Sequence, residues 1–274
     1  MPKAPLLMML LSTLLAACGF APATKTPMPY LQAQVERQSD TLLVMLPGRK
    51  EGMESFPNHG FFATGSELGI DMLAADAHFG YYRERTFVQR LHEDIILPAR
   101  QQGYQHIWLL GLSRGGFGAV LYCNEHSEMI DGLVLLAAYP GESELVQEIQ
   151  AAGGLSQWPN TGQAGKDFER DVWQWLKMAT GARASGPHII VAYGEDDRFA
   201  TANGLLAQRL PPTQVFTRPG GHQWDVWQAL WQDLVNAGLP IASSPTATAQ
   251  PLAAASHPNR TANAHTHTHQ EKQR

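Results

Sequence analysis

The segment that most constrains the fold is the pentapeptide Gly-Leu-Ser-Arg-Gly at residues 111–115. A β-rich apolar run, residues 106–110, precedes it, and small and apolar residues, 116–122, follow it. A strand, a sharp turn and a helix in this order force the serine into a strained backbone conformation and lift its hydroxyl clear of the sheet edge. The pattern predicts a nucleophile at Ser113, although an ordinary glycine turn is the alternative. Close approach of helix and sheet is favoured by four glycines, Gly111, Gly115, Gly116 and Gly118.

Strand and helix patterns alternate along the chain around this segment. This alternation favours a parallel sheet with helical crossovers. The net charge of −5 is spread without blocks, so no nucleic-acid partner is expected, and no Walker-type phosphate loop points to a nucleotide cofactor. No cofactor is predicted. The expected strands are 41–46, 72–75, 106–110, 132–139, 188–193 and 215–217, and two of the expected helices are 86–101 and 225–237. Four large apolar residues recur at near-helical spacing in and just before the second helix and are expected to face the core: Trp224, Trp227, Trp231 and Leu234.

A serine hydroxyl attacks only when a base removes its proton and a third group orients that base. The strand expected at 188–193 leads into an acidic turn, in which Asp197 is preferred as the acid over its neighbour Asp196. The next strand leads into a glycine turn that presents His222 as the base. The alternatives are a solvated acidic turn and a structural histidine.

Negative charge that develops on an attacked carbonyl requires backbone donors already in place. One expected donor is the N–H of Arg114, the residue after the serine. The strand 41–46 ends at Pro47, so the second expected donor is the N–H of Arg49, or of Gly48 if the turn is tighter; a simple proline–glycine turn is the alternative. The side chains of Arg49, Lys50 and Arg114 either attract a substrate with a carboxylate or phosphate or pair with Glu51 or Glu54.

Over about residues 41–237 the chain resembles the bacterial α/β-hydrolase superfamily of serine esterases and lipases. The resemblance implies an α/β fold with a mostly parallel central sheet flanked by helices. It also implies a serine hydrolase that cleaves a carboxylic ester or thioester of a small molecule or lipid through an acyl-serine. One departure is Pro47, where the family usually has histidine before glycine. The residues that carry the resemblance are the turn Leu46–Arg49, the segment Gly111–Gly115, the acidic turn Gly194–Asp197 and the pair Gly221–His222.

Two further functions are compatible with the same residues. An acyltransferase would use the same three groups and pass the acyl group to an alcohol or amine. A non-catalytic envelope lipoprotein on a hydrolase fold would bind a partner without turnover. Acceptor choice depends on pocket hydration, which the sequence does not specify.

Two segments are candidates to shape a substrate pocket. His78, Tyr81 and Tyr82 follow a strand and would emerge at the same sheet edge, with packing against neighbouring loops as the alternative. Residues 140–184 are too numerous for one crossover helix. The resemblance implies that they form a small helical cap over the site, and an ordinary pair of packed crossover helices is the alternative.

The N-terminal residues predict export. Residues 1–17 have a basic start and a short apolar run typical of a signal peptide, and the quartet Leu15–Cys18 resembles the lipobox of bacterial lipoproteins. Lipidation of Cys18 would anchor the chain to a membrane, with residues 18–40 as a tether. A disulfide is not expected, because the second cysteine, Cys123, falls on the helix after Ser113. The expected location is the cell envelope, at the outer membrane facing the periplasm.

The remaining chain is divided into a single enzyme domain, residues 41–239, and a tail, residues 240–274. The tail is rich in Ala, Ser, Thr, Pro and His and is predicted to be disordered, because it has too few large apolar residues to form a core. Its alternating histidines, His265, His267 and His269, would bind a transition metal only weakly, so no metal site is assigned. The protein is expected to be a monomer.

Overall fold

The computed structural model describes residues 22–35, 39–162, 165, 167–181 and 186–240. The predicted signal peptide, the lipidation site Cys18 and nearly all of the predicted tail, with its histidines, lie outside the described residues. None of the helices formed by the described part of the chain is long and apolar enough to cross a membrane.

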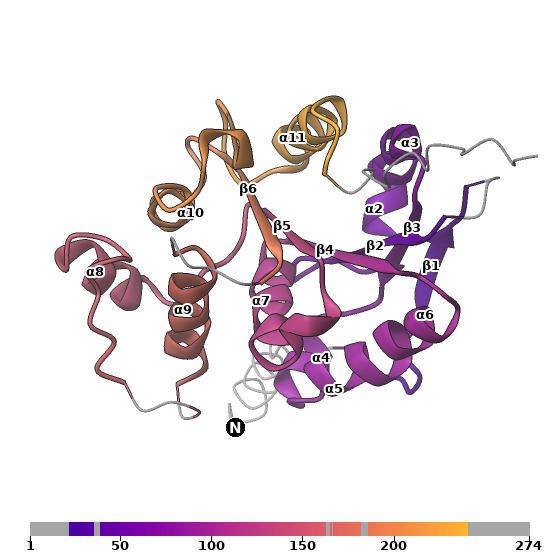
Figure 1. Cartoon of the computed structure of the whole chain (residues 1–274), viewed down its shortest axis with the longest axis horizontal. Coiled ribbons are helices and arrows are strands. Elements are labelled where there is room, and N and C mark those ends of the chain that lie inside the picture. Colours follow the sequence, from indigo (N-terminus) through magenta and orange to yellow (C-terminus); the bar gives the residue numbers. More distant parts are fainter. Residues whose placement is uncertain (1–21, 36–38, 163–164, 166, 182–185, 241–274) are drawn as a thin grey trace, which may run out of the picture. The chain divides into compact units, whose positions relative to one another are not determined.

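A seven-stranded sheet forms the centre of the domain, in the order β1-β3-β2-β4-β5-β6-β7 (Figure 1). Six strands run parallel, and β1 pairs antiparallel with β3 at one edge. This confirms the predicted α/β fold class. The strands are β1 (Tyr30–Ala33), β2 (Thr41–Leu46), β3 (Asp71–Ala75), β4 (His106–Leu112), β5 (Gly132–Leu136), β6 (His188–Gly194) and β7 (Val215–Arg218).

Helices cover both faces of the sheet, which explains the nearly continuous apolar composition of its central strands. In β2, Leu42 and Val44 belong to the core cluster on one face, and Leu43 and Met45 to the cluster on the other. The first face is covered by α4 (Phe79–Arg83), α5 (Phe87–Leu91), α6 (Leu97–Gln101), α7 (Arg114–His126), α8 (Ser143–Ala151), α9 (Phe168–Ala179) and α10 (Ala200–Ala207) (Figure 1). The second face is covered by α2 (Ser55–Asn58), α3 (Phe61–Gly65) and α11 (Trp224–Asn236).

The order of the strands reverses at β2. The chain passes from β2 to β3 on one side and returns to β4 on the other, so β2 lies between β3 and β4. In open α/β sheets, ligands bind at the carboxyl ends of the strands where the order reverses. The loops after β2 and β4 are therefore placed at the expected ligand-binding edge.

The two helices expected from their periodicity are present with small differences. The segment 86–101 is one continuous helix, but its middle, His92–Ile96, is a π-helical turn between α5 and α6. The final helix, α11, places Trp227 and Trp231 in the core. The indole N–H of Trp231 donates to the carbonyl of Phe61 at 3.0 Å, which joins α11 to α3.

The N-terminal tether prediction is wrong for the residues nearest to the domain. Residues 30–33 form β1, and Met28 is buried against the core. The carboxylate of Asp94 accepts the backbone N–H of Met28 at 2.9 Å, so this segment is bonded to the π-helical turn His92–Ile96. Sequence analysis missed β1 because it is a short edge strand with only a partial polar–apolar alternation.

The structure favours packed crossover helices over the predicted cap for the segment 140–184. Helix α9 packs against α7, and α8 packs against α10. The large aromatic side chains of this segment, Trp158 and Trp173, are buried in the core on that face of the sheet, at 0% and 1% exposure. Burial of these two large rings in the core removes apolar surface from water and so stabilises the packed arrangement.

Candidate active site

Ser113 lies at the sharp turn between β4 and α7. Its backbone adopts φ 51° and ψ −115°, a strained combination for a residue with a side chain. The turn is held from three sides: the N–H of Ser113 donates to the carbonyl of Leu136, and the carbonyl of Ser113 accepts from the N–H groups of Gly116 and Tyr139, all at 2.9 Å. These bonds compensate for the strain and fix the direction of the hydroxyl.

Glycines make this turn possible by removing side chains where backbones touch. A Cβ on Gly115 would lie 2.1 Å from the carbonyl oxygen of Leu46, at the end of β2. A Cβ on Gly111 would lie 2.4 Å from the Cα of Gly116. The start of α7 therefore lies directly against the loop that follows β2, as the four glycines in the sequence predicted.

His222 joins the serine to an aspartate. Its Nε2 lies 2.9 Å from Oγ of Ser113, and its Nδ1 lies 2.7 Å from Oδ2 of Asp197. With Nδ1 protonated toward the carboxylate, Nε2 is free to accept the serine proton. The three side chains come from the ends of β4, β6 and β7 and have the geometry of a Ser-His-Asp triad.

The carboxylate of Asp197 is fully buried. Its second oxygen, Oδ1, accepts the backbone N–H of Phe199 at 2.8 Å, so both oxygens are fixed. Asp196, the alternative acid, instead accepts the backbone N–H of Gly220 through Oδ2 at 3.2 Å. The structure thus places Asp197 on the histidine and Asp196 on the turn that carries the histidine.

Two aromatic rings that the sequence analysis did not single out for this role enclose the imidazole of His222. The rings of Phe199 and Trp227 stand edge to face against it, with centroids 5.1 and 4.8 Å away. Trp227 was assigned to the core only, and Phe199 is recognisable in the sequence only as an aromatic residue two positions after Asp197. Both rings restrict rotation of the imidazole and exclude water from its faces.

The predicted oxyanion donors lie on both sides of the serine. Arg114 is the first residue of α7, where a helix N–H has no acceptor within the helix. Gly48 is close enough that a Cβ on it would lie 3.6 Å from Cβ of Ser113, and Arg49 follows it. Both loops thus lie next to Ser113, and the assignment of their N–H groups as oxyanion donors stays a prediction.

The contacts of His78, Tyr81 and Tyr82 favour packing within the domain, which is the alternative to their predicted place in a substrate pocket. His78 caps α4 by accepting the N–H of Gly80 at 3.1 Å, and the buried Tyr81 donates its hydroxyl to the carbonyl of Lys25 at 2.9 Å. Tyr82 stacks on Phe87, with ring centroids 4.4 Å apart. All three pack within the domain, because the short helix α4 turns them inward and presents the half-buried Phe79 instead.

Burial also determines the protonation of these phenols. It raises the pKa values of Tyr81 and Tyr82 above the ordinary value for tyrosine. Burial likewise raises the pKa of the Cys123 thiol, which lies on α7 facing the core as predicted. None of these groups is therefore available as an anion near neutral pH.

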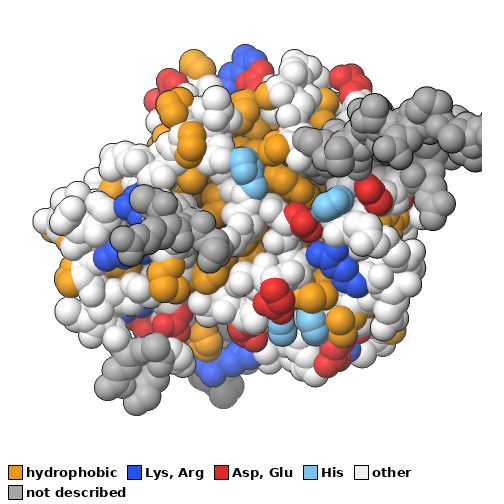
Figure 2. Space-filling model, viewed as in Figure 1, with side chains coloured by type: hydrophobic (Ala, Val, Ile, Leu, Met, Phe, Trp, Pro, Cys, Tyr) orange, Lys and Arg blue, Asp and Glu red, His pale blue; other side chains and the backbone are white. Residues whose placement is uncertain are grey.

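An open pocket of about 250 Å³ lies between α8 and α10, beside the acid loop. Phe199, whose ring contacts His222, contributes to its wall, and Arg198 adds a positive charge. In the space-filling view, drawn from the same direction as Figure 1, hydrophobic side chains gather along a hollow with a histidine side chain at its border (Figure 2). The pocket is large enough for part of a small-molecule substrate.

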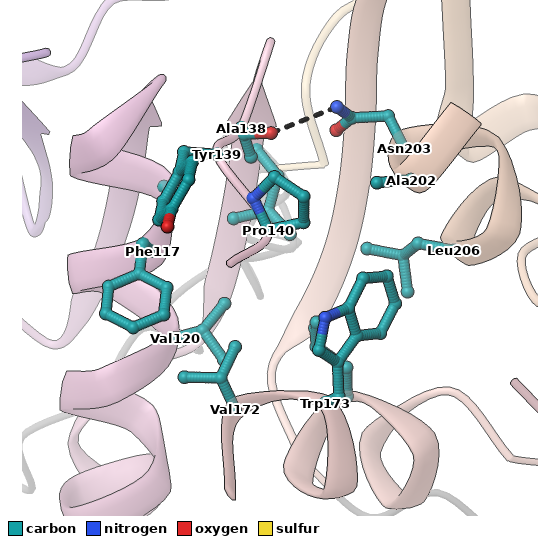
Figure 3. A pocket seen from close by; sticks show the side chains of 13 residues that line it. Phe117, Val120, Ala138, Tyr139, Pro140, Val172, Trp173, Ala202, Asn203 and Leu206 are labelled. Carbon is teal, nitrogen blue, oxygen red and sulfur yellow. Dashed lines mark hydrogen bonds between the residues drawn. The ribbon is translucent and has the colours of Figure 1, made fainter. Parts of the chain in front are cut away.

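A second, much smaller crevice lies behind the serine turn, between α7, α9 and α10 (Figure 3). Its volume is about 20 Å³, which is room for one water molecule. Asn203 closes one end by donating to the carbonyl of Ala138 at 3.0 Å. This crevice is a packing gap of the core and not a substrate pocket.

No cluster of three or more His, Cys, Asp or Glu side chains suited to a metal ion occurs among residues with described positions.

Comparisons with known proteins give a fold but no close relative. No family model matches the sequence, and no curated protein matches it. Among solved structures, a ferulic acid esterase is similar, at 17% identity and a TM-score of 0.54 over 80% of this chain and 96% of that one. Est1E from Butyrivibrio proteoclasticus has 16% identity and a TM-score of 0.58 over 78% and 95% of the two chains.

A third solved structure extends the comparison. The S-formylglutathione hydrolase FrmB from Staphylococcus aureus has 15% identity and a TM-score of 0.51, over 80% of this chain and 98% of that one. At such low identity the likeness concerns the arrangement of strands and helices, which matches the expectation from the Gly111–Gly115 turn. Both the topology of the sheet and these neighbours identify the chain as a protein of the α/β-hydrolase fold.

Proposed function

We propose that the chain is a serine hydrolase that cleaves a carboxylic ester or thioester of a small molecule through an acyl-serine intermediate. The observation that carries this proposal is the continuous chain of hydrogen bonds from Ser113 through His222 to Asp197, at 2.9 and 2.7 Å. The names of the structural neighbours, a ferulic acid esterase and an S-formylglutathione hydrolase among them, support this reaction class.

In the first half-reaction, Nε2 of His222 removes the proton as Oγ of Ser113 attacks the carbonyl carbon. The carbonyl oxygen becomes negatively charged and is bound by the N–H groups of Arg114 and of Arg49 or Gly48. When the tetrahedral intermediate collapses, the protonated His222 gives its proton to the leaving alcohol or thiol. The buried carboxylate of Asp197 stabilises the imidazolium during this step.

In the second half-reaction, water takes the place of the leaving group. His222 removes a proton from the water, whose oxygen attacks the acyl carbon, and then returns the proton to Oγ of Ser113. The carboxylic acid is released and the serine is regenerated. An alcohol or amine acceptor in place of water would make the same chemistry an acyl transfer.

A fluorophosphonate probe tests the nucleophile directly. We expect stoichiometric labelling of the folded protein at Ser113, located by peptide mass spectrometry, and none in the Ser113→Ala variant. The same variant should lose hydrolysis of a short para-nitrophenyl ester while keeping the circular dichroism of the parent. Absence of labelling in the folded parent would instead favour a non-catalytic binding protein, and product analysis with competing alcohols separates hydrolysis from acyl transfer.

We also propose that the domain is attached to the cell envelope through a lipid on Cys18, at the outer membrane facing the periplasm. The support is the sequence alone: the basic start and apolar run of residues 1–17 and the lipobox-like quartet Leu15–Cys18. When labelled palmitate is fed to expressing bacteria, the label should be incorporated into the parent chain, and the labelled chain should fractionate with membranes. Cys18→Ser should abolish incorporation; a labelled Cys18→Ser chain would contradict the anchor.

A further inference from the structure

Two arginine side chains meet over one aromatic ring beside the serine. The guanidinium carbon of Arg49 lies 5.2 Å from the centroid of the Phe79 ring, and that of Arg114 lies 5.6 Å from it. Arg114 also lies 4.3 Å from the centroid of the Tyr139 ring. The rings attract both cations, and both stay within 5.6 Å of the centroid of the same Phe79 ring.

Neither arginine forms an ion pair with a carboxylate of the described residues. None of the ion pairs among the described residues includes Arg49, Lys50 or Arg114, and none of these side chains donates a hydrogen bond to another described residue. Several other arginines, by contrast, are bonded to acids or carbonyl groups: Arg90, Arg100, Arg170, Arg209 and Arg218. Arg85 and Arg198, which lie over the rings of Phe168 and Phe199, also have no acid partner among the described residues, but only Arg49 and Arg114 share one ring.

Nearby carboxylates are occupied elsewhere. Glu51 accepts the hydroxyl of Ser55 at 2.6 Å. Glu142 and Glu169 both accept the hydroxyl of Tyr139, at 3.0 and 3.1 Å, at the far end of the ring on which Arg114 lies. The alternative that Arg49 or Arg114 pairs with Glu51 or Glu54 is thus not what the structure contains.

The position of the two cations relative to the reaction is set by the backbone. Arg114 follows Ser113 directly, and Arg49 follows Gly48, which approaches the Ser113 side chain. Their N–H groups are the proposed oxyanion donors, so their side chains leave from the same two points of the loop and helix. Both arginine side chains therefore start within one residue of the proposed oxyanion site, and their guanidinium groups share the Phe79 ring.

From these observations we infer that Arg49 and Arg114, held by Phe79 and Tyr139, form a subsite for an anionic group on the substrate. The inference rests on the proposed hydrolase function and narrows it to esters or thioesters that carry a carboxylate or phosphate. Guanidinium groups bind such anions through paired hydrogen bonds, and those of Arg49 and Arg114 form no ion pair with the described carboxylates. The anion lies on either the acyl or the leaving-group side of the scissile bond.

Matched ester pairs that differ in one charge test the subsite. For the acyl side, the pair is para-nitrophenyl hydrogen adipate and its uncharged methyl ester; for the leaving-group side, it is para-acetoxybenzoate and its methyl ester. We expect kcat/KM for the anionic member to exceed that of the neutral member by about tenfold in one of the two pairs, as a charged hydrogen bond provides. The preference should fall as salt is added, because the site is open to solvent.

Substitutions then assign the preference to the two side chains. Arg49→Gln and Arg114→Gln should each reduce the anionic-to-neutral ratio at least threefold, and Arg49→Lys should retain more of it than Arg49→Gln. The matched control is Arg83→Gln, which removes an exposed charge from the same short helix that carries Phe79. It should leave the ratio at the parent value.

The outcomes separate this inference from the proposed function. Hydrolysis that depends on Ser113 but shows no anion preference in either pair, or a preference that survives both glutamine substitutions, overturns the subsite and leaves the hydrolase intact. If the parent protein hydrolyses none of the four esters, the result counts against the proposed hydrolase function. The subsite is then tested without turnover, by calorimetry of monomethyl adipate with Ser113→Ala: binding weakened by Arg114→Gln supports it, and binding insensitive to both arginines overturns it.

Discussion

Asp196 holds the glycine turn that carries the histidine, by accepting the N–H of Gly220 at 3.2 Å, while the next residue, Asp197, binds the histidine itself. Two adjacent carboxylates thus support one imidazole in different ways. One positions its backbone, and the other orients its ring. Only the second is buried and in contact with the reacting groups.

Replacement of each aspartate by asparagine distinguishes these two roles. Asp197→Asn should lower kcat by roughly 10³- to 10⁴-fold, because an amide stabilises the wrong tautomer of His222 and does not balance its positive charge. Asp196→Asn keeps an oxygen acceptor for Gly220 and should cost less than about tenfold. Steady-state kinetics of the two variants measures the difference, and equal losses would contradict the assignment of Asp197.

The backbone strain at Ser113 should be visible in stability. Both Ser113→Ala and Ser113→Gly remove the hydroxyl, but only glycine adopts φ 51° without steric conflict. We therefore expect Ser113→Gly to have a free energy of unfolding higher than that of Ser113→Ala by about 1 kcal/mol. Urea denaturation of the two inactive variants measures this, and an alanine variant as stable as the glycine variant would argue against strain at the turn.

The close contact between α7 and the loop after β2 predicts that Gly115→Ala disturbs both stability and activity. Its Cβ would meet the carbonyl oxygen of Leu46 at 2.1 Å, and backbone on both sides must move. We expect a loss of about 1–3 kcal/mol in the free energy of unfolding. A lower kcat should accompany it, because the same movement displaces the donors at Gly48 and Arg49.

Gly204→Ala, within α10, is the matched control for this substitution. A Cβ there would come no closer than 3.7 Å to the Tyr193 hydroxyl, and helix propensity alone should raise the stability by roughly 0.5–1 kcal/mol. Thermal unfolding and ester hydrolysis are measured on both variants. If Gly115→Ala and Gly204→Ala changed the stability and the activity equally, helix propensity and not the approach to Leu46 would determine the effect.

The pair formed by Glu148 and Arg170 should contribute to stability in acid. The guanidinium of Arg170 and the indole N–H of Trp158 hold the pKa of Glu148 at about 2, below its ordinary value of 4.5. Because the folded-state pKa is depressed, this contribution is complete above pH 4.5 and is lost as the pH falls toward 2. The carboxylate is partly exposed, so the ion pair contributes at most about 1 kcal/mol to the free energy of unfolding.

Glu148→Gln isolates that contribution. Above pH 5 the variant should be less stable than the parent, and the difference should shrink as the pH falls from about 4.5 to about 2. Urea unfolding at a series of pH values in constant salt measures it. A difference that stays constant across this range would show that the pair does not titrate as its contacts imply.

Much of the site was predictable because parallel α/β sheets align the ends of their strands. Ser113 and His222 lie 109 residues apart, yet Ser113, Asp197 and His222 each lie in the loop or turn that follows a strand of the same sheet. Since all these strands run parallel, their carboxyl ends meet at one edge. Strand order along the chain was therefore enough to bring the three residues together.

Other features were not predictable because they depend on contacts between distant segments. Tyr81 and Tyr82 follow a strand as a pocket residue would, but Tyr81 bonds to the distant Lys25, and it is Phe79 of the same helix that contacts Arg49. Residues 140–184 contain the aromatic residues of a cap, but packing against α7 and α10 buries them. Local pattern does not specify which partner a side chain meets.

By itself the sequence determined the fold class, the sharp turn at Ser113 and the order of the groups that follow it, because alternating strands and helices and a glycine-rich turn are local properties. Only the tertiary structure decided that Asp197 and not Asp196 binds His222, and that Arg49 and Arg114 share the ring of Phe79 with no ion pair to any carboxylate whose position is described. These choices depend on differences of a few ångströms between loops that are far apart in the chain. Such distances follow from the packing of the whole core.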